Sequence, residues 1–221
     1  MDYDFNFDPV WRSFDNLLSG LALGLGMAVV SLLAGAVIGL LGAYARTSQI
    51  PPLRWLAAGY VEVIRNTPIL LLILFVFFGL PEIGVFIFDK YDSFMLTLAI
   101  YAGAYLTEVF RAGLGSIPVH YVEAGKAIGL LPWQRQRYVV LPVMFRITLP
   151  ALSSNFISLF KDTSLATAIA VPELTFQARK INVESFRVIE TWLVASVLYL
   201  TVCYGIAFAL RLVERRFASI R

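Results

Sequence analysis

The stretch of residues 16–45 constrains the fold more than any other part of the sequence, because it contains no charged residue. A helix needs about 20 mostly apolar residues to cross the hydrocarbon core of a bilayer, and this stretch exceeds that length. Hydrophobic residues make up 59% of the chain and charged residues only 15%. Since roughly half apolar is usual for soluble domains, the sequence predicts an integral membrane protein.

Four more apolar stretches follow, and we expect residues 1–221 to form one all-α transmembrane domain with five membrane-spanning helices. The predicted spans are 16–45, 60–80, 93–112, 138–160 and 190–211, preceded by a short extracytoplasmic N-terminus at 1–15. In the first span, Gly20 and Gly24 are four residues apart, as are Gly35 and Gly39. This spacing lets helix backbones approach closely, so we expect tight helix packing here.

The distribution of Lys and Arg predicts the orientation of the chain, because these residues gather in the cytoplasmic loops of membrane proteins. If the N-terminus lies outside, the segments that lie inside carry two thirds of the 18 Lys and Arg residues. We therefore expect the N-terminus outside and the C-terminus inside. The loop between the third and fourth spans, residues 119–137, then lies in the cytoplasm.

This loop predicts a short helix at about 121–131 that lies across the cytoplasmic face. The small residues Ala124, Gly125 and Ala127 leave one side of it flat, and Gly129 allows a positive φ at the joint with a second short helix. We expect Pro142 to begin the next membrane helix. Such a helix suits a groove on another protein, although an ordinary amphipathic helix at the membrane surface has a similar pattern.

The loop resembles a known motif, E-A-A-x3-G-x9-I-x-L-P, which is found in the permease subunits of binding-protein-dependent ABC importers. Gly stands at its third position and Val in place of Ile. The matching residues are Glu123, Ala124, Gly125, Gly129, Leu141 and Pro142. In that family the loop is the coupling helix that docks on the cytosolic ATPase, so the resemblance implies ATPase coupling by these six residues.

Four further segments are similar to the polar amino acid subfamily, which imports amino acids such as histidine, glutamine, glutamate, arginine or cystine. They are R-N-T-P at 65–68, E-V-F-R-A-G at 108–113, S-I-P at 116–118 and K-D-T-S-L at 161–165. His120 and Tyr121 stand where the subfamily usually has Gly-Gln, and Val143 replaces a common Gln. These departures leave open which amino acid is carried.

The resemblance implies a MetI-like permease of an ATP-driven amino acid importer in a bacterial inner membrane. It implies a dimer with a second permease chain, identical or related, together with a cytosolic ABC ATPase dimer and an extracytoplasmic solute-binding protein. The chain itself has no G-x-x-x-x-G-K-[ST] motif and one histidine, so we expect it to hold no cofactor, metal or nucleic acid and not to be an enzyme. ATP and Mg²⁺ are expected on the partner ATPase.

The predicted substrate path follows one face of the fourth span. Asn155 and Asp162 are seven residues apart, about two helical turns, and Ser158 lies near the same face. An α-ammonium group suits Asp162, and Asn155 can donate or accept hydrogen bonds. Thr163 and Thr67 are added to the path, the latter because Pro68 frees a backbone carbonyl. Asn155 in place of an acid disfavours a strongly cationic side chain, since a guanidinium would require a second carboxylate.

Plainer alternatives remain open for these residues. Lys161 and Asp162 are also interpreted as an ion pair at the outer interface, and Pro68 as a simple helix start. The i, i+3 pairs Glu62/Arg65 and Glu108/Arg111 are expected to form local ion pairs.

Two other classes of function also fit a five-span protein. One is a gradient-driven secondary transporter or channel, for which Asp162 is the only candidate acid within the membrane. The other is a membrane subunit that carries no solute.

Overall fold

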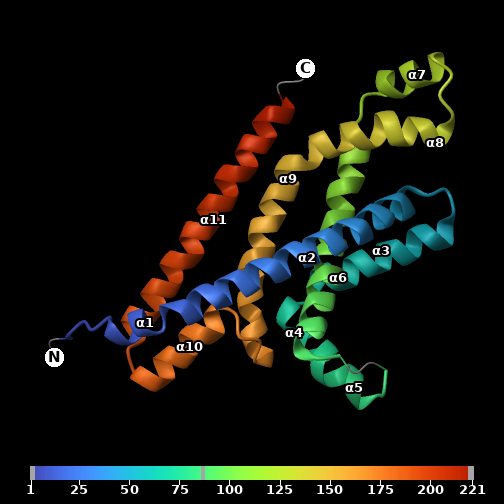
Figure 1. Ribbon diagram of the computed structural model, residues 1–221. Coiled ribbons are helices and arrows are strands. Elements are labelled where there is room, and N and C mark those ends of the chain that lie inside the picture. The colour runs from blue at the N-terminus through green and yellow to red at the C-terminus, as the bar shows by residue number, and fades with distance from the viewer. Residues whose placement is uncertain (1–2, 86–87, 219–221) are drawn as a thin grey trace.

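The computed structural model describes residues 3–85 and 88–218, and within these ranges every regular element is helical (Figure 1). The α-helices are α1 (Asp8–Arg12), α2 (Phe14–Thr47), α3 (Pro51–Asn66), α4 (Ile69–Leu74), α5 (Leu80–Glu82), α6 (Lys90–Gly115), α7 (Val119–Ala127), α8 (Pro132–Arg135), α9 (Leu141–Asp162), α10 (Leu174–Ser185) and α11 (Val188–Ala218). Two π-helical turns, η1 (Phe75–Gly79) and η2 (Gln136–Val140), and one 3₁₀ helix, η3 (Thr163–Ile169), connect some of them. The expected all-α membrane fold is confirmed.

Four helical segments in the described ranges are long and apolar enough to cross a membrane. They are Phe14–Thr47, Lys90–Gly115, Pro132–Ile169 and Val188–Arg216. The second predicted span, 60–80, is instead a bent pair, in which Pro51–Asn66 and Ile69–Glu82 meet at 105°. Thr67 has an extended backbone at this bend, because the ring of Pro68 disfavours the helical conformation in the residue before it. The pair makes a fifth crossing only if its two arms together form one broken span.

The fourth span begins earlier than the sequence suggested. Pro142 does not start a helix, because α8, η2 and α9 follow one another without a break from Pro132 to Asp162. A proline inside an α-helix lacks the N–H for one hydrogen bond, and its ring clashes with the carbonyl of the preceding turn. The wide π turn η2 lies immediately before Pro142 and gives this ring space. The helix therefore continues through the proline, and the cytoplasmic hairpin is joined directly to the span.

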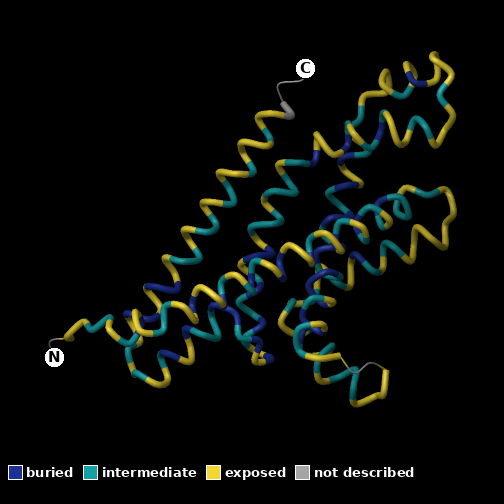
Figure 2. Tube along the Cα trace, viewed as in Figure 1, coloured by how far each residue is buried: buried dark blue, intermediate teal, exposed yellow. Residues whose placement is uncertain are grey.

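Close packing of α2 on α6 forms the centre of the fold (Figure 2). A Cβ atom added to Gly35 would lie 2.7 Å from the Cβ of Ala102, and one added to Gly39 would lie 2.6 Å from the Cβ of Leu106. The predicted tight packing along the glycines of the first span is thus confirmed, with α6 as the partner of this pair. In contrast, α11 shows mostly exposed and intermediate positions in Figure 2 and is left for lipid or protein to cover.

The chain also closes on itself at the end opposite the α7–α8 hairpin (Figure 1). There the Tyr3 hydroxyl and the Asn6 backbone N–H both donate hydrogen bonds to the carboxylate of Glu190, at the start of α11. The Arg187 side chain donates to the carbonyl of Asp4 and pairs with Glu190, which is fully buried. We call this group of residues the N-terminal strap.

Candidate functional site

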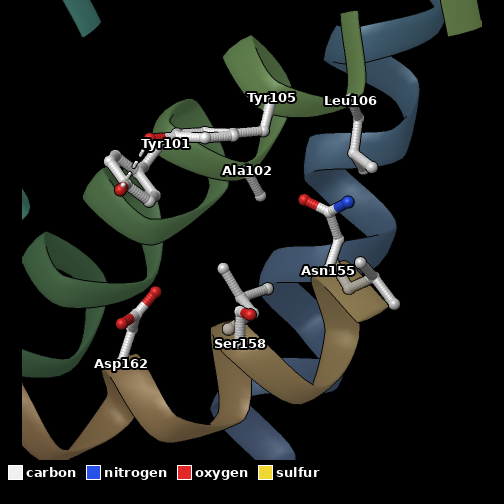
Figure 3. Close-up of a pocket in the computed structure, with 9 residues that line it drawn as sticks. Tyr101, Ala102, Tyr105, Leu106, Asn155, Ser158 and Asp162 are labelled. Atoms are coloured by element: carbon white, nitrogen blue, oxygen red, sulfur yellow. Dashed lines mark hydrogen bonds between the residues drawn. The ribbon is translucent and has the colours of Figure 1, made fainter. Parts of the chain in front are cut away.

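One face of α9 and one face of α6 enclose a cavity of about 320 Å³, which we call the Asp162 cavity (Figure 3). Asn155, Ser158 and Asp162 come from α9, as the helical spacing predicted. Tyr101 and Tyr105 of α6 lie across from them, and Leu32 of α2, Ala102, Leu106 and Leu159 complete the lining. Three of the five residues assigned to the substrate path are thus brought together in one cavity.

The polar groups of the Asp162 cavity are available to a solute. The Asn155 amide donates one hydrogen bond to the carbonyl of Ala151 at 2.8 Å, and the rest of the amide is directed toward the cavity (Figure 3). The Asp162 carboxylate makes no ion pair with any residue in the described ranges, so the alternative of a Lys161–Asp162 pair is not observed. An unpaired carboxylate in a membrane segment is costly unless it faces a cavity or a partner.

Thr163 and Thr67 lie outside this cavity. The Thr163 hydroxyl donates to the carbonyl of Phe160 at 2.7 Å, and the side chain is buried against Gly24 of α2. The Thr67 hydroxyl donates to the carbonyl of Val63 at 2.7 Å, at the end of α3. Both hydroxyls are therefore engaged with backbone at helix ends, where they support the fold around the cavity rather than line it.

Tyr101 and Tyr105 were missed by the sequence reasoning. Their hydroxyl groups are 3.2 Å apart, and their ring centroids 4.9 Å apart. They lie in the middle of a span, whereas tyrosines in membrane proteins gather at the two interfaces. Two tyrosines at i, i+4 far from the ends of an apolar helix are the signal that points to a polar cavity.

A second cavity of about 410 Å³, which we call the Arg65 cavity, shares Tyr105 and Asn155 with the first. Its remaining lining comes from α3, α6 and α9 and includes Arg65, Glu108, Val109, Ala112, Gly113, Ser116, Ile147, Thr148 and Ala151. The two shared side chains thus separate one polar space from another along the same pair of helices.

The charged residues around the Arg65 cavity differ in one respect from the expectation. The Arg111 guanidinium is 2.7 Å from the Glu108 carboxylate, as predicted, and Arg46 of α2 adds a second contact at 3.3 Å. The expected pair between Glu62 and Arg65 is not formed. Glu62 accepts a hydrogen bond from the Asn66 amide, and the Arg65 guanidinium lies over the ring of Tyr105, 5.0 Å from its centroid.

The α7–α8 hairpin has the shape that the sequence predicted. Helix α7 ends at Ala127, Gly129 follows with φ of 78°, and α8 begins at Pro132. A Cβ added to Gly125 would lie 3.3 Å from the Cγ of Arg135, so a glycine here lets α7 rest on the helix that leads into α9. Leu141 packs on the core of the fold at the base of the hairpin.

The outer surface of the hairpin is exposed and partly apolar. Glu123, Ala124 and Lys126 are exposed, and large apolar side chains lie beside them. These are Val119, Tyr121, Ile128, Leu131, Trp133 and Tyr138, all exposed in the isolated chain. A cluster of this kind at one end of the molecule is typical of a protein contact surface.

The sequence profile of one protein family matches residues 35–219, most of the chain, and that family is described as the binding-protein-dependent transport system inner membrane component. The chain belongs to this family. It is therefore a multi-pass permease of the inner membrane and a component of a transport system.

Curated relatives resemble this permease over nearly their whole length. The glutamine transport system permease protein GlnP of Escherichia coli (strain K12) is 38% identical over 213 residues, which cover 96% of this permease and 97% of GlnP. The L-cystine transport system permease protein TcyB of Bacillus subtilis (strain 168) is 34% identical, over 95% of this permease and 90% of TcyB.

Two solved structures agree with the fold of this permease. One is a chain of an amino acid ABC transporter with histidines, which is 29% identical, superimposes with a TM-score of 0.88, and covers 97% of this permease and 100% of that chain. The other belongs to the MetNI methionine ABC transporter in an inward-facing conformation, with a TM-score of 0.75 and 22% identity over 93% of this permease and 98% of that chain. The MetI-like architecture expected from the sequence is confirmed.

Proposed function

We propose that this permease lines the path of an ATP-driven importer for a neutral polar amino acid, with glutamine as the first candidate. The observation that carries the proposal is the unpaired carboxylate of Asp162 in a membrane cavity that also presents Asn155 and Ser158. The amino acid substrates in the names of the relatives and of the most similar solved structure support the same class of solute.

The chemistry of the Asp162 cavity favours a zwitterion with an uncharged side chain. The Asp162 carboxylate is suited to an α-ammonium group, because charge-assisted hydrogen bonds are about twice as strong as neutral ones. Asn155 and Ser158 can donate and accept toward a side-chain amide. Asp162 is the sole carboxylate in the lining, so a guanidinium side chain would lack a second acid with which to pair.

The α7–α8 hairpin is proposed as the contact with the ATPase, with Glu123, Ala124 and Gly125 on the docking helix. Gly129 sets the angle of the turn. Because α8, η2 and α9 form one uninterrupted helix, a displacement of α7 against Arg135 is carried along the same rod to Asn155 and Asp162. ATP binding would move the hairpin and open the path outward, and hydrolysis would reset it. This is alternating access driven by a partner.

The partners follow from this assignment. A second permease chain, identical or related, is proposed to complete the path, because one chain leaves α11 and much of α3 exposed. A cytosolic ABC ATPase dimer would bind ATP and Mg²⁺ below the hairpin. A solute-binding protein would deliver the amino acid on the outer side, where we place the N-terminus; the C-terminus is placed inside.

The test is amino acid uptake by proteoliposomes that contain the permease with its ATPase and binding protein. We expect uptake of glutamine to require ATP, and Asp162→Asn to abolish it while the complex still assembles and hydrolyses ATP. Asp92→Asn is the matched control, because Asp92 is exposed at the start of α6 and lines neither cavity. Uptake driven by an ion gradient without ATP would identify a secondary transporter, and full uptake by Asp162→Asn would refute the role of the cavity.

A further inference from the structure

The Arg65 cavity carries a cation that the proposed function does not use. Arg65 makes no ion pair in the part of the chain that the structure describes, although Arg46 and Arg111 nearby are both engaged with Glu108. Its guanidinium lies over the Tyr105 ring, which binds the face of the cation but accepts few of its five N–H donors. An ionised side chain of a membrane protein is costly unless it has a partner or faces water, so these donors require an acceptor.

We propose that the Arg65 cavity is a second binding site for the amino acid, in which Arg65 recognises the α-carboxylate. The inference rests on the proposed function and extends it from one site to two. A guanidinium presents two parallel N–H groups that match the two oxygens of a carboxylate, and it does so better than an ammonium group. The zwitterion is the solute class that carries both an ammonium group for Asp162 and a carboxylate for Arg65.

The arrangement of the two cavities supports passage of one solute between them. Tyr105 and Asn155 line both, so a molecule that leaves the Asp162 cavity past these side chains enters the space beside Arg65. The Tyr101 hydroxyl lies within electrostatic range of both Asp162 and Arg65, so the two opposite charges lie on either side of the tyrosine pair. The ammonium and carboxylate groups of one α-amino acid are thus drawn toward opposite ends of the shared wall.

The charge of the Arg65 cavity favours an anionic group. Glu108 is the only acid in its lining, and this carboxylate is already held by two arginines. The free positive charge of Arg65 therefore dominates the field in this space. The Asp162 cavity has the opposite character, since its lining contains a carboxylate and no cation.

The experiment measures binding of radiolabelled L-glutamine to the purified permease–ATPase complex, without nucleotide and without the binding protein. The second ligand is 4-aminobutanamide, which keeps the amine and the side-chain amide of glutamine but lacks the α-carboxylate. We expect Arg65→Gln to weaken glutamine binding about 10- to 100-fold, as for loss of a hydrogen bond to a charged group, and to leave binding of 4-aminobutanamide unchanged. Arg65→Lys should recover part of the loss, because it restores the charge without the planar fork.

Arg54→Gln is the matched control, because Arg54 lies exposed on the same helix and lines neither cavity. It should bind both ligands like the wild type. Wild-type affinity of Arg65→Gln for glutamine would overturn the inference, as would an equal loss of both ligands, which would indicate structural damage to α3. If the wild-type complex bound neither compound, the proposed function would fail together with the inference; otherwise the two stand apart.

Discussion

Gly39 offers a quantitative test of the packing that holds the two cavities in place. It lies where α2 crosses α6, and α6 carries Tyr101, Tyr105 and Glu108. A Cβ added by Gly39→Ala would lie 2.6 Å from the Cβ of Leu106 and 2.9 Å from its carbonyl carbon. Non-bonded carbon atoms prefer about 3.5–4.0 Å, so the helices must move apart by roughly 1 Å. Backbone atoms cannot rotate away, and we therefore expect overpacking to cost about 1–3 kcal/mol.

Gly26→Ala on the same helix provides the control for this prediction. A Cβ at Gly26 would meet nothing within 4 Å, so the substitution gains helix propensity, about 1 kcal/mol, without a clash. Because both variants share this gain, the difference between them isolates the clash. Each kcal/mol shifts Tm by about 2–4 °C in a protein of this size, so Gly39→Ala should unfold several degrees below Gly26→Ala in a thermal unfolding assay of the purified complex. Equal Tm values for the two variants would refute the close packing of α2 on α6.

Three further predictions concern the hairpin and a buried acid. Gly125→Val should press α7 away from Arg135 and raise the amount of ATP hydrolysed per amino acid imported, measured in proteoliposomes; an unchanged ratio would contradict the coupling path. Gly129→Ala should destabilise the turn by about 1 kcal/mol, because φ is 78° there, and limited proteolysis should then cut the hairpin faster than in the wild type. Burial raises the pKa of the Glu173 carboxyl above its ordinary value of 4.5, against hydrogen bonds from Thr175, Phe176 and Tyr199. Glu173 therefore stabilises the fold fully below pH 4.5 and loses that contribution as pH rises through the higher folded-state pKa, so Tm of the wild type should fall over this window relative to Glu173→Gln; parallel curves would exclude the effect.

Features that depend on neighbouring residues in the sequence could be predicted. The spans follow from runs of apolar residues, and the shared face of Asn155 and Asp162 follows from the helical repeat. The turn of the hairpin was predicted at Gly129 because a positive φ is a local property of glycine. The spacing of Gly35 and Gly39 indicated a close helix partner, although it did not say which helix that partner is.

Features that depend on which helices face one another could not be predicted. The wall of Tyr101 and Tyr105 comes from α6, and Arg65 comes from α3, so both required the three-dimensional arrangement. The bend at Thr67 was missed because a proline restricts the preceding residue without fixing the direction of the next helix. Helix α10 was also missed: it is polar and short, and Glu173 caps it through hydrogen bonds from the backbone of Thr175 and Phe176.

The N-terminal strap has a mechanical consequence for the permease. Tyr3 and Asn6 stand at one extreme of the polypeptide, yet both are fastened to Glu190 at the beginning of the last crossing. Parting them would strand a buried carboxylate without its donors, a penalty of at least about 1–3 kcal/mol for each unmet group. We therefore expect the first and last helices to stay clasped on that side while the transporter cycles. The widening that admits a solute would then fall to the opposite flank, where α6 and α9 face each other.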